Sequence, residues 1–213
     1  MLQTNKSVIM SAHNSVYNIQ KHYSFIEYKE IANNLAIAGK SSGEETPERI
    51  DATKINAQRL NRIYKTFAPN AETKRIIGEL IQNWEWIVIT ESWCGDGAQL
   101  IPIIAKIAEL NNLIQLKFIF RDENEIIMNL HLTNGSKSIP KLICLNGQNK
   151  EYIGEWGPRP LQIHEKAKEF KTTNPNASHE DFVRNLHLLY AQDKGLSFEI
   201  EFANLITQWM NIG

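Results

Sequence analysis

One cysteine, Cys94, stands at the junction between a predicted strand and a predicted helix. The strand is the short, almost entirely apolar run Trp84–Thr90, whose β-branched residues are typical of a strand buried on both faces. Helical spacing of apolar residues then predicts a helix over residues 98–110. Cys94 is therefore expected at the N-terminus of this helix, where free backbone amides and the helix dipole stabilise a thiolate. The chemistry that this position favours is thiol–disulfide exchange.

Asp96, two residues further along the chain, acts in the opposite direction. A carboxylate in the first turn stabilises a helix but repels a neighbouring thiolate. We therefore predict that the pKa of Cys94 is lowered, although less than it would be in an uncharged loop. Two plainer interpretations stay open: Cys94 is a buried, unreactive thiol, and Asp96 only starts the helix.

The composition argues against several classes of function. The chain has 213 residues, 42% of them hydrophobic, and a formal net charge of −1. It has no basic excess with which to bind nucleic acid or an anionic membrane. No apolar run reaches the roughly 18 residues of a membrane span, and the polar N-terminus does not resemble a secretory signal. With only two cysteines, Cys94 and Cys144, the chain is predicted to be cytoplasmic.

Metal and cofactor sites are not predicted. The six histidines show no metal-binding spacing, and the sequence contains no glycine-rich phosphate-binding loop. We predict neither a metal nor a cofactor. Glu91, close to the cysteine, is interpreted as a solvated or arginine-paired carboxylate.

The elements around the cysteine predict an α/β fold. Residues 24–27 have the form of a capping box, which opens a helix that should end near Gly39. Two more helices, around residues 55–67 and 71–82, precede the first strand. The rest of the chain predicts strands at 113–120, 140–145 and 150–154, and helices at 122–132, after Pro160, at 178–193 and at 197–210.

The order of these elements predicts a mixed four-stranded sheet flanked by helices. Right-handed crossovers should place the first three strands in one sheet, and the Asn146-Gly147 turn should add an antiparallel edge strand. The predicted organisation is a flexible N-terminal segment at 1–23, a helical extension at 24–70, an α/β core at 71–175 and a second helical extension at 176–213.

Several segments of the chain resemble thioredoxins. The motif Trp93-Cys94-Gly95-Asp96 resembles the Trp-Cys-Gly-Pro-Cys loop of thioredoxins. The combination of segments, spread over about residues 55–195, is similar to a bacterial thioredoxin-like family in which the second cysteine is often missing. The segments that carry the resemblance are residues 91–96, 121–124, 132–135, 138–140 and 156–159.

The resemblance implies a thioredoxin-like fold and a set of site residues. Cys94 would be the catalytic residue. Pro140 would follow a cis peptide bond, and Ile139 would offer its backbone amide and carbonyl to an extended peptide beside the cysteine. The neighbouring loop residues would contact the substrate: Trp93, Gly95 and Asp96.

The loop that follows the predicted hairpin should approach the same place. There Trp156 would form an apolar rim with Trp93. Arg159 would supply a cation to a carboxylate, to a glutathione-like ligand or to the Cys94 thiolate. The alternative is structural: Trp156 packs in the fold, and Arg159 caps carbonyls or pairs with Glu155.

Two departures from redox thioredoxins exclude a dithiol cycle within this loop. Gly97 stands where the second cysteine would fall, and Val88 stands where thioredoxins bury a proton-accepting acid. Cys144 lies four residues past Pro140 along a strand, about 13 Å away. A disulfide needs Cα atoms within about 7 Å, so Cys144 is predicted to be a small core residue.

These observations lead to two main hypotheses. The first is a monothiol redox protein, in which Cys94 exchanges with protein or peptide thiols and disulfides, or with a low-molecular-weight thiol. The alternative is a non-catalytic module that binds a peptide or protein in a groove beside Pro140. A weaker third hypothesis is an interaction scaffold built on the terminal helices, and it leaves the oligomeric state open.

Overall fold

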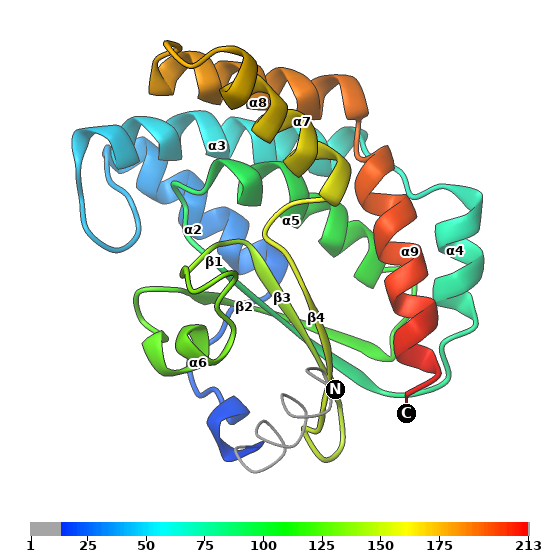
Figure 1. Cartoon of the computed structure of the whole chain (residues 1–213). Coiled ribbons are helices and arrows are strands. Elements are labelled where there is room, and N and C mark those ends of the chain that lie inside the picture. The colour runs from blue at the N-terminus through cyan, green and yellow to red at the C-terminus, as the bar shows by residue number, and fades with distance from the viewer. Residues whose placement is uncertain (1–13, 213) are drawn as a thin grey trace.

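The computed structural model, which describes residues 14–212, is built around one mixed sheet (Figure 1). The strand order is β2-β1-β3-β4, in which β1 is parallel to β2 and antiparallel to β3, and β3 is antiparallel to β4. This is the four-stranded α/β arrangement flanked by helices that the sequence predicts. The strands are β1 (Trp84–Thr90), β2 (Ile114–Phe120), β3 (Lys141–Asn146) and β4 (Tyr152–Trp156).

A series of right-handed crossovers would make β3 parallel to β1, whereas β3 is antiparallel to it. Helix α6 (Glu125–Leu130) is short, and the chain after it stays at the carboxyl end of β1 instead of returning to the opposite end. As a result Lys141, the first residue of β3, pairs with Ile89 near the end of β1. This reversal brings Pro140 to the same end of the sheet as the cysteine loop.

Capping residues set the ends of two of the helices. Ser24 and Ser178 each form a capping box, and Gly39 ends the first long helix in the left-handed conformation, with φ of 65°. The capping box at residues 24–27 and the helix end at Gly39 are confirmed. The remaining helical elements are η1 (Asn14–Tyr17), α2 (Phe25–Ala38), α3 (Pro47–Thr66), α4 (Ala71–Gly78), α5 (Gly95–Ala108), α7 (Leu161–Thr173), α8 (His179–Asp193) and α9 (Leu196–Met210).

The two faces of the sheet are covered unequally. Side chains of β1 alternate between them: Trp84, Trp86 and Val88 pack in the larger cluster with α2–α5 and α7–α9, whereas Ile87 and Ile89 pack in a smaller cluster with η1 and α6. All seven residues of β1 are buried, as predicted. Cys94 belongs to the smaller cluster.

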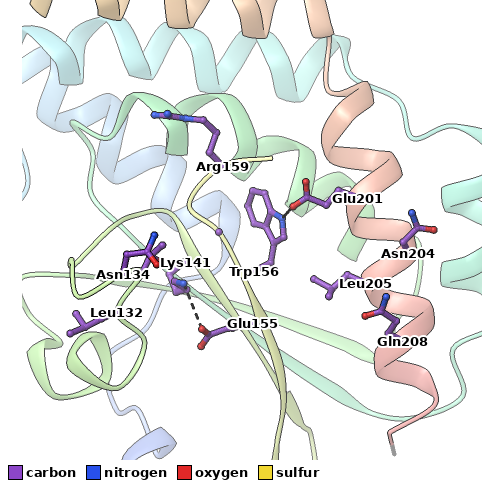
Figure 2. A pocket seen from close by; sticks show the side chains of 12 residues that line it. Leu132, Asn134, Lys141, Glu155, Trp156, Arg159, Glu201, Asn204, Leu205 and Gln208 are labelled. Atoms are coloured by element: carbon purple, nitrogen blue, oxygen red, sulfur yellow. Dashed lines mark hydrogen bonds and ion pairs between the residues drawn. The ribbon is translucent and has the colours of Figure 1, made fainter. Parts of the chain in front are cut away.

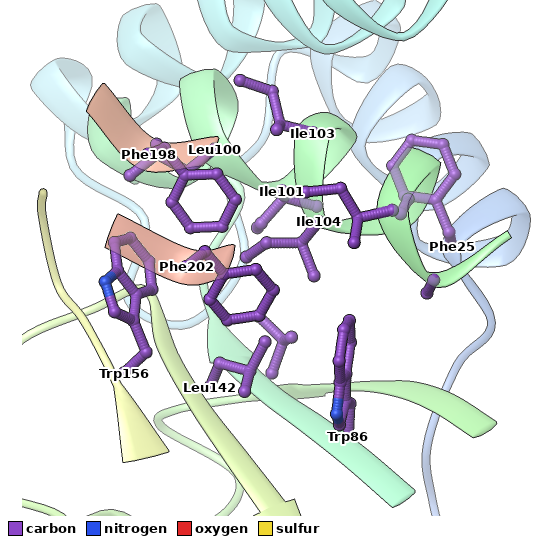
Figure 3. Close-up of a cluster of buried hydrophobic side chains, with 14 of the residues drawn as sticks. Phe25, Trp86, Leu100, Ile101, Ile103, Ile104, Leu142, Trp156, Phe198 and Phe202 are labelled. Atoms are coloured by element: carbon purple, nitrogen blue, oxygen red, sulfur yellow. The ribbon is translucent and has the colours of Figure 1, made fainter. Parts of the chain in front are cut away.

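The C-terminal helix is part of the main core. Phe198 and Phe202 of α9 are fully buried and lie between α5 and the sheet, next to Trp156 (Figure 3). Trp209 of the same helix approaches β4 so closely that a Cβ added at Gly154 would lie 2.0 Å from its Nε1 atom. Only glycine fits at that position, so the predicted C-terminal extension shares one core with the α/β elements.

The predicted flexible segment, residues 1–23, lies partly outside the described residues. Within the described part, Tyr17 of η1 is buried, and its hydroxyl lies 2.9 Å from Nε2 of His131. This contact joins η1 to the end of α6. Within residues 14–212 we find no helix with the length and apolar character of a membrane span.

Candidate functional site

Cys94 is the N-cap residue of α5. Its Sγ accepts a hydrogen bond from the Gly97 N–H (3.2 Å), and its thiol donates to the carbonyl of Ile139 (3.3 Å). The Ile139–Pro140 peptide bond is cis. Only 6% of Cys94 is exposed. The sulfur therefore lies at the N-terminus of α5, against the backbone that precedes Pro140, and both of its hydrogen-bonding functions are used.

The environment of Cys94 makes it a neutral thiol. Burial raises its pKa from 9.0 to about 12, and the Asp96 carboxylate adds to the increase. The amides of Gly97 and Asp96, together with Arg121, lower the pKa by less. The predicted lowering of this pKa is wrong. It assumed a hydrated sulfur, whereas the cost of a thiolate in a desolvated site exceeds the stabilisation that a helix N-terminus provides.

The packing leaves no room for a second thiol in the loop. A Cβ added at Gly97 would lie 2.8 Å from Oγ1 of Thr90 and 3.3 Å from Sγ of Cys94. The other cysteine, Cys144, is a free thiol with no exposed surface, packed in the larger cluster on the opposite face of the sheet. Its predicted role as a core residue is confirmed, and it cannot resolve a disulfide at Cys94.

Asp96 ties the cysteine loop to two other parts of the chain. Arg159 binds its carboxylate through both Nε (2.9 Å) and Nη2 (2.6 Å), and the Tyr190 hydroxyl of α8 donates to the same carboxylate at 2.6 Å. Arg159 thus approaches the cysteine loop but pairs with Asp96 and not with Glu155. The guanidinium is occupied, so it is not a free cation for a ligand or for the sulfur.

The two tryptophans predicted to form one rim lie in different places. Two guanidinium groups lie over the Trp93 ring, that of Arg49 at 4.5 Å and that of Arg121 at 4.9 Å from the ring centroid. Trp156 is buried against Phe198, at 4.7 Å between ring centroids, and its Nε1–H donates to Glu201 at 2.7 Å (Figures 2 and 3). The structural alternative for Trp156, packing within the fold, is the one that the structure shows.

Glu91 is buried, which differs from the predicted solvated carboxylate. Its oxygens accept hydrogen bonds from the Ser42 hydroxyl and from the Asp122 N–H (2.9 Å). Ser42 and Ser92 also exchange backbone-to-hydroxyl bonds of 2.9 and 2.8 Å. Burial raises the pKa of Glu91. This network holds the loop that precedes α3 against the cysteine loop.

A pocket of about 550 Å³ opens above the sulfur, between α3 and α8. We call it the α3–α8 pocket. Its floor contains several of the predicted site residues, whereas Pro140, Trp156 and Arg159 do not line it. The floor residues are Trp93, Cys94, Gly95, Asp96 and Ile139, and the walls come from α3 (Glu48, Asp51, Ala52, Ile55, Asn56, Arg59) and from α8 (His179, Glu180, Val183, Leu186, His187).

The wall residues are the part of the site that the sequence did not reveal. His187 of α8 comes so close that a Cβ added at Gly95 would lie 3.0 Å from its Cε1 atom. Burial, and then the charge of Arg59, lower the pKa of His187 to about 4, so the ring is neutral at pH 7. Apolar periodicity located α3 and α8, but it cannot show that the two helices meet over the cysteine loop.

No group of three or more potential metal ligands occurs in the part of the chain that the structure describes. Comparison with known proteins then places the fold. A family model described as thioredoxin matches residues 43–171. No curated protein matches the chain.

Two solved structures are similar to the chain. One is a protein of unknown function from Pseudomonas aeruginosa, with 15% sequence identity and a TM-score of 0.54 over 90% of this chain and 99% of that chain. The other is an HIV epitope-scaffold, with 15% identity and a TM-score of 0.52 over 72% of this chain and 85% of that chain. At this identity the likeness concerns the fold alone.

Proposed function

The chain belongs to the thioredoxin family, and from that premise we propose that it is a non-catalytic, thioredoxin-fold binding module. Its ligand, a peptide or a segment of another protein, would enter the α3–α8 pocket. Cys94 would form part of the pocket floor and would not act as a nucleophile. We also propose that the protein works in the reducing environment of the cytoplasm, a proposal that its two free thiols, Cys94 and Cys144, support.

The state of the Cys94 thiol carries this proposal. A thiolate cannot donate a hydrogen bond, and a carbonyl oxygen 3.3 Å from Sγ repels a thiolate, so the contact with Ile139 favours the protonated form. The thiolate is the form that attacks disulfides. With the pKa raised to about 12, only a very small fraction of Cys94 ionises at pH 7.

Ile139 offers a ligand one backbone group. Its carbonyl already accepts from Cys94, but its N–H makes no hydrogen bond to any residue in the described range 14–212. Ile139 lines the pocket. An extended segment that enters the pocket would therefore find a free backbone donor there, as in strand-addition recognition.

Monothiol exchange is the second candidate, favoured by one observation: Cys94 lines the pocket. In that case the Cys94 thiolate would attack a disulfide, form a mixed disulfide and expel the other sulfur as a thiolate. A second thiol from solution would then release Cys94. The raised pKa of Cys94 favours the binding function over this reaction.

Two assays together test the proposal. Turnover of a glutathione mixed disulfide by the wild type should equal that of Cys94→Ser. Peptides selected from a random display library should bind wild type and Cys94→Ser equally. They should lose binding to Ala52→Trp, which fills the pocket from α3, and keep it to Lys65→Trp, an exposed control that lines no described pocket. Turnover that depends on Cys94, or binding indifferent to Ala52→Trp, would overturn the proposal.

A further inference from the structure

Arg59 in the wall of the α3–α8 pocket is a cation without a counter-ion. Its Nη1 donates to the side chain of Asn56 at 3.0 Å, and no carboxylate of residues 14–212 lies within ion-pair distance of it. The side chain is half-buried, and burial and the charge of Arg62 lower its pKa. A partly desolvated guanidinium that lacks an anion is unfavourable, and an anionic ligand would relieve this cost.

The surroundings of Arg59 contain no competing acid. A smaller cavity of about 380 Å³ continues from the pocket at this end, and only apolar, amide, imidazole and guanidinium side chains line it. His187 is neutral at pH 7, and its Nδ1 lies 3.2 Å from the amide nitrogen of Gln99. This end of the pocket therefore offers a positive charge and neutral hydrogen-bonding groups.

The opposite end of the pocket is acidic. Asp51 and Glu48 precede Arg59 by two to three turns of α3, so at about 1.5 Å per residue they lie roughly 12 Å and 16 Å from it along the helix. Glu180 lies in the first turn of α8, two turns before His187. An anionic group is repelled at this end and attracted at the other, which fixes the direction in which a charged ligand lies.

The walls and floor between the two ends are mostly apolar. Ile55 of α3 is half-exposed, and it lines the pocket together with Ala52. Val183 and Leu186 of α8 stand opposite, above Ile139. These side chains would bury an apolar ligand body of about two helical turns in length.

Resting on the proposed binding function, we propose that the α3–α8 pocket binds a carboxylate joined to an apolar body, with the carboxylate on Arg59 and the apolar part above Cys94 and Ile139. Two sources share this chemistry: the C-terminus of a peptide with apolar last residues, and a free organic acid. Either would pair the guanidinium in the geometry that it prefers for carboxylates.

Calorimetric titration of the full chain with defined probes tests this inference. The probes are octanoate and its neutral analogue octanamide, and an N-acetylated four-residue alanine–leucine peptide as the free acid and as the C-terminal amide. Each is measured on the wild type, Arg59→Gln, Lys65→Gln and Ala52→Trp, after circular dichroism shows that the variants are folded. Lys65→Gln is the charge-matched control on the same helix, because Lys65 is exposed, has no ion-pair partner in the described chain and lines neither the pocket nor the smaller cavity beside it.

At least one acid should bind the wild type at least about tenfold more tightly than its amide. Arg59→Gln should remove that preference, Lys65→Gln should change it less than about threefold, and Ala52→Trp should abolish binding. Equal binding of acids and amides, lost only in Ala52→Trp, would overturn the carboxylate inference while the binding module stands. Absence of binding by every probe, or equal losses in Arg59→Gln and Lys65→Gln, would also overturn it.

Discussion

Two cavities of similar size differ in whether their charged side chains have partners. The α3–α8 pocket measures about 550 Å³, and a groove between β4 and α9 measures about 610 Å³. In the β4–α9 groove the charged groups have partners. Lys141 lies 3.8 Å from Glu155, and Glu201 accepts from Trp156 (Figure 2). Arg159 binds Asp96. In the α3–α8 pocket, Arg59 has no such partner among residues 14–212.

If the proposed function is right, the α3–α8 pocket differs from the β4–α9 groove in the pairing of its charged groups and not in its volume. Polar groups that satisfy one another hold the fold and gain little from a ligand. A charged group left unpaired beside apolar walls gains when a complementary ligand arrives. The first two tests use matched pairs of variants, one from the groove and one from the pocket, and the pair with the larger expected contrast comes first.

The tryptophan pair should show the largest contrast. Trp156→Ala removes a buried ring and its hydrogen bond to Glu201, and should lower the free energy of unfolding by about 3–5 kcal/mol. Trp93→Ala removes two stacked guanidinium contacts from a partly exposed ring and should cost about 1–2 kcal/mol. Urea denaturation measures both. Equal losses of unfolding free energy in the two variants would contradict the distinction between the β4–α9 groove and the α3–α8 pocket.

The arginine pair should differ in the same direction. Arg159→Gln leaves the Asp96 carboxylate with only the Tyr190 hydroxyl and should cost about 2–3 kcal/mol. Arg59→Gln removes an unpaired, partly desolvated charge and should change stability by less than about 0.5 kcal/mol. Thermal and urea unfolding at one pH give both values. A loss for Arg59→Gln as large as that for Arg159→Gln would show that Arg59 has a structural partner.

Local sequence signals predicted most of the fold. The buried run Trp84–Thr90 and the capping box at residues 24–27 are short-range features, set by residues that are neighbours along the chain. The direction of β3 could not be read in this way. It depends on how far the chain travels after the short helix α6, which is a property of packing.

The sequence could predict only those parts of the site that are set by residues close together along the chain. The position of Cys94 at the start of α5 follows from the strand-to-helix junction, and its approach to Ile139 follows from the family resemblance. The predicted pKa of Cys94 was wrong because the burial of the sulfur depends on residues far along the chain, such as Ile139, which packs in the same cluster. Arg59 escaped notice for the same reason: a cation on an amphipathic helix shows its missing partner only in three dimensions.

Alkaline pH offers a finer test at the pocket floor. The pKa of Cys94 is raised to about 12 in the folded state, against about 8.5 in an unfolded chain. Its contribution to stability is therefore complete below about pH 8.5 and is lost as the pH rises towards 12, with a slope of at most about 1.4 kcal/mol per pH unit. Cys94→Ala should flatten this decline. Since both proteins share every other titrating group, parallel curves would mean that Cys94 is not buried as a thiol.

Acidic pH offers a second pH-dependent test, at the wall of the same pocket. Burial lowers the pKa of His187 to about 4, against about 6.5 in an unfolded chain. The stabilisation from the neutral ring is complete above about pH 6.5 and is lost as the pH falls towards 4. His187→Gln should remove this part of the acid dependence in urea titrations. An unchanged acid slope would place His187 in water, away from Gly95 and the pocket.

The central claim, that Cys94 is a buried neutral thiol and not a nucleophile, is tested most directly by its alkylation in the native protein. The rate of iodoacetamide labelling at Cys94 is followed by peptide mass spectrometry from about pH 6 to about pH 11. We expect slow labelling whose rate still rises at the highest pH, because the pKa lies near 12. A plateau with an apparent pKa at or below about 8.5 would contradict the account.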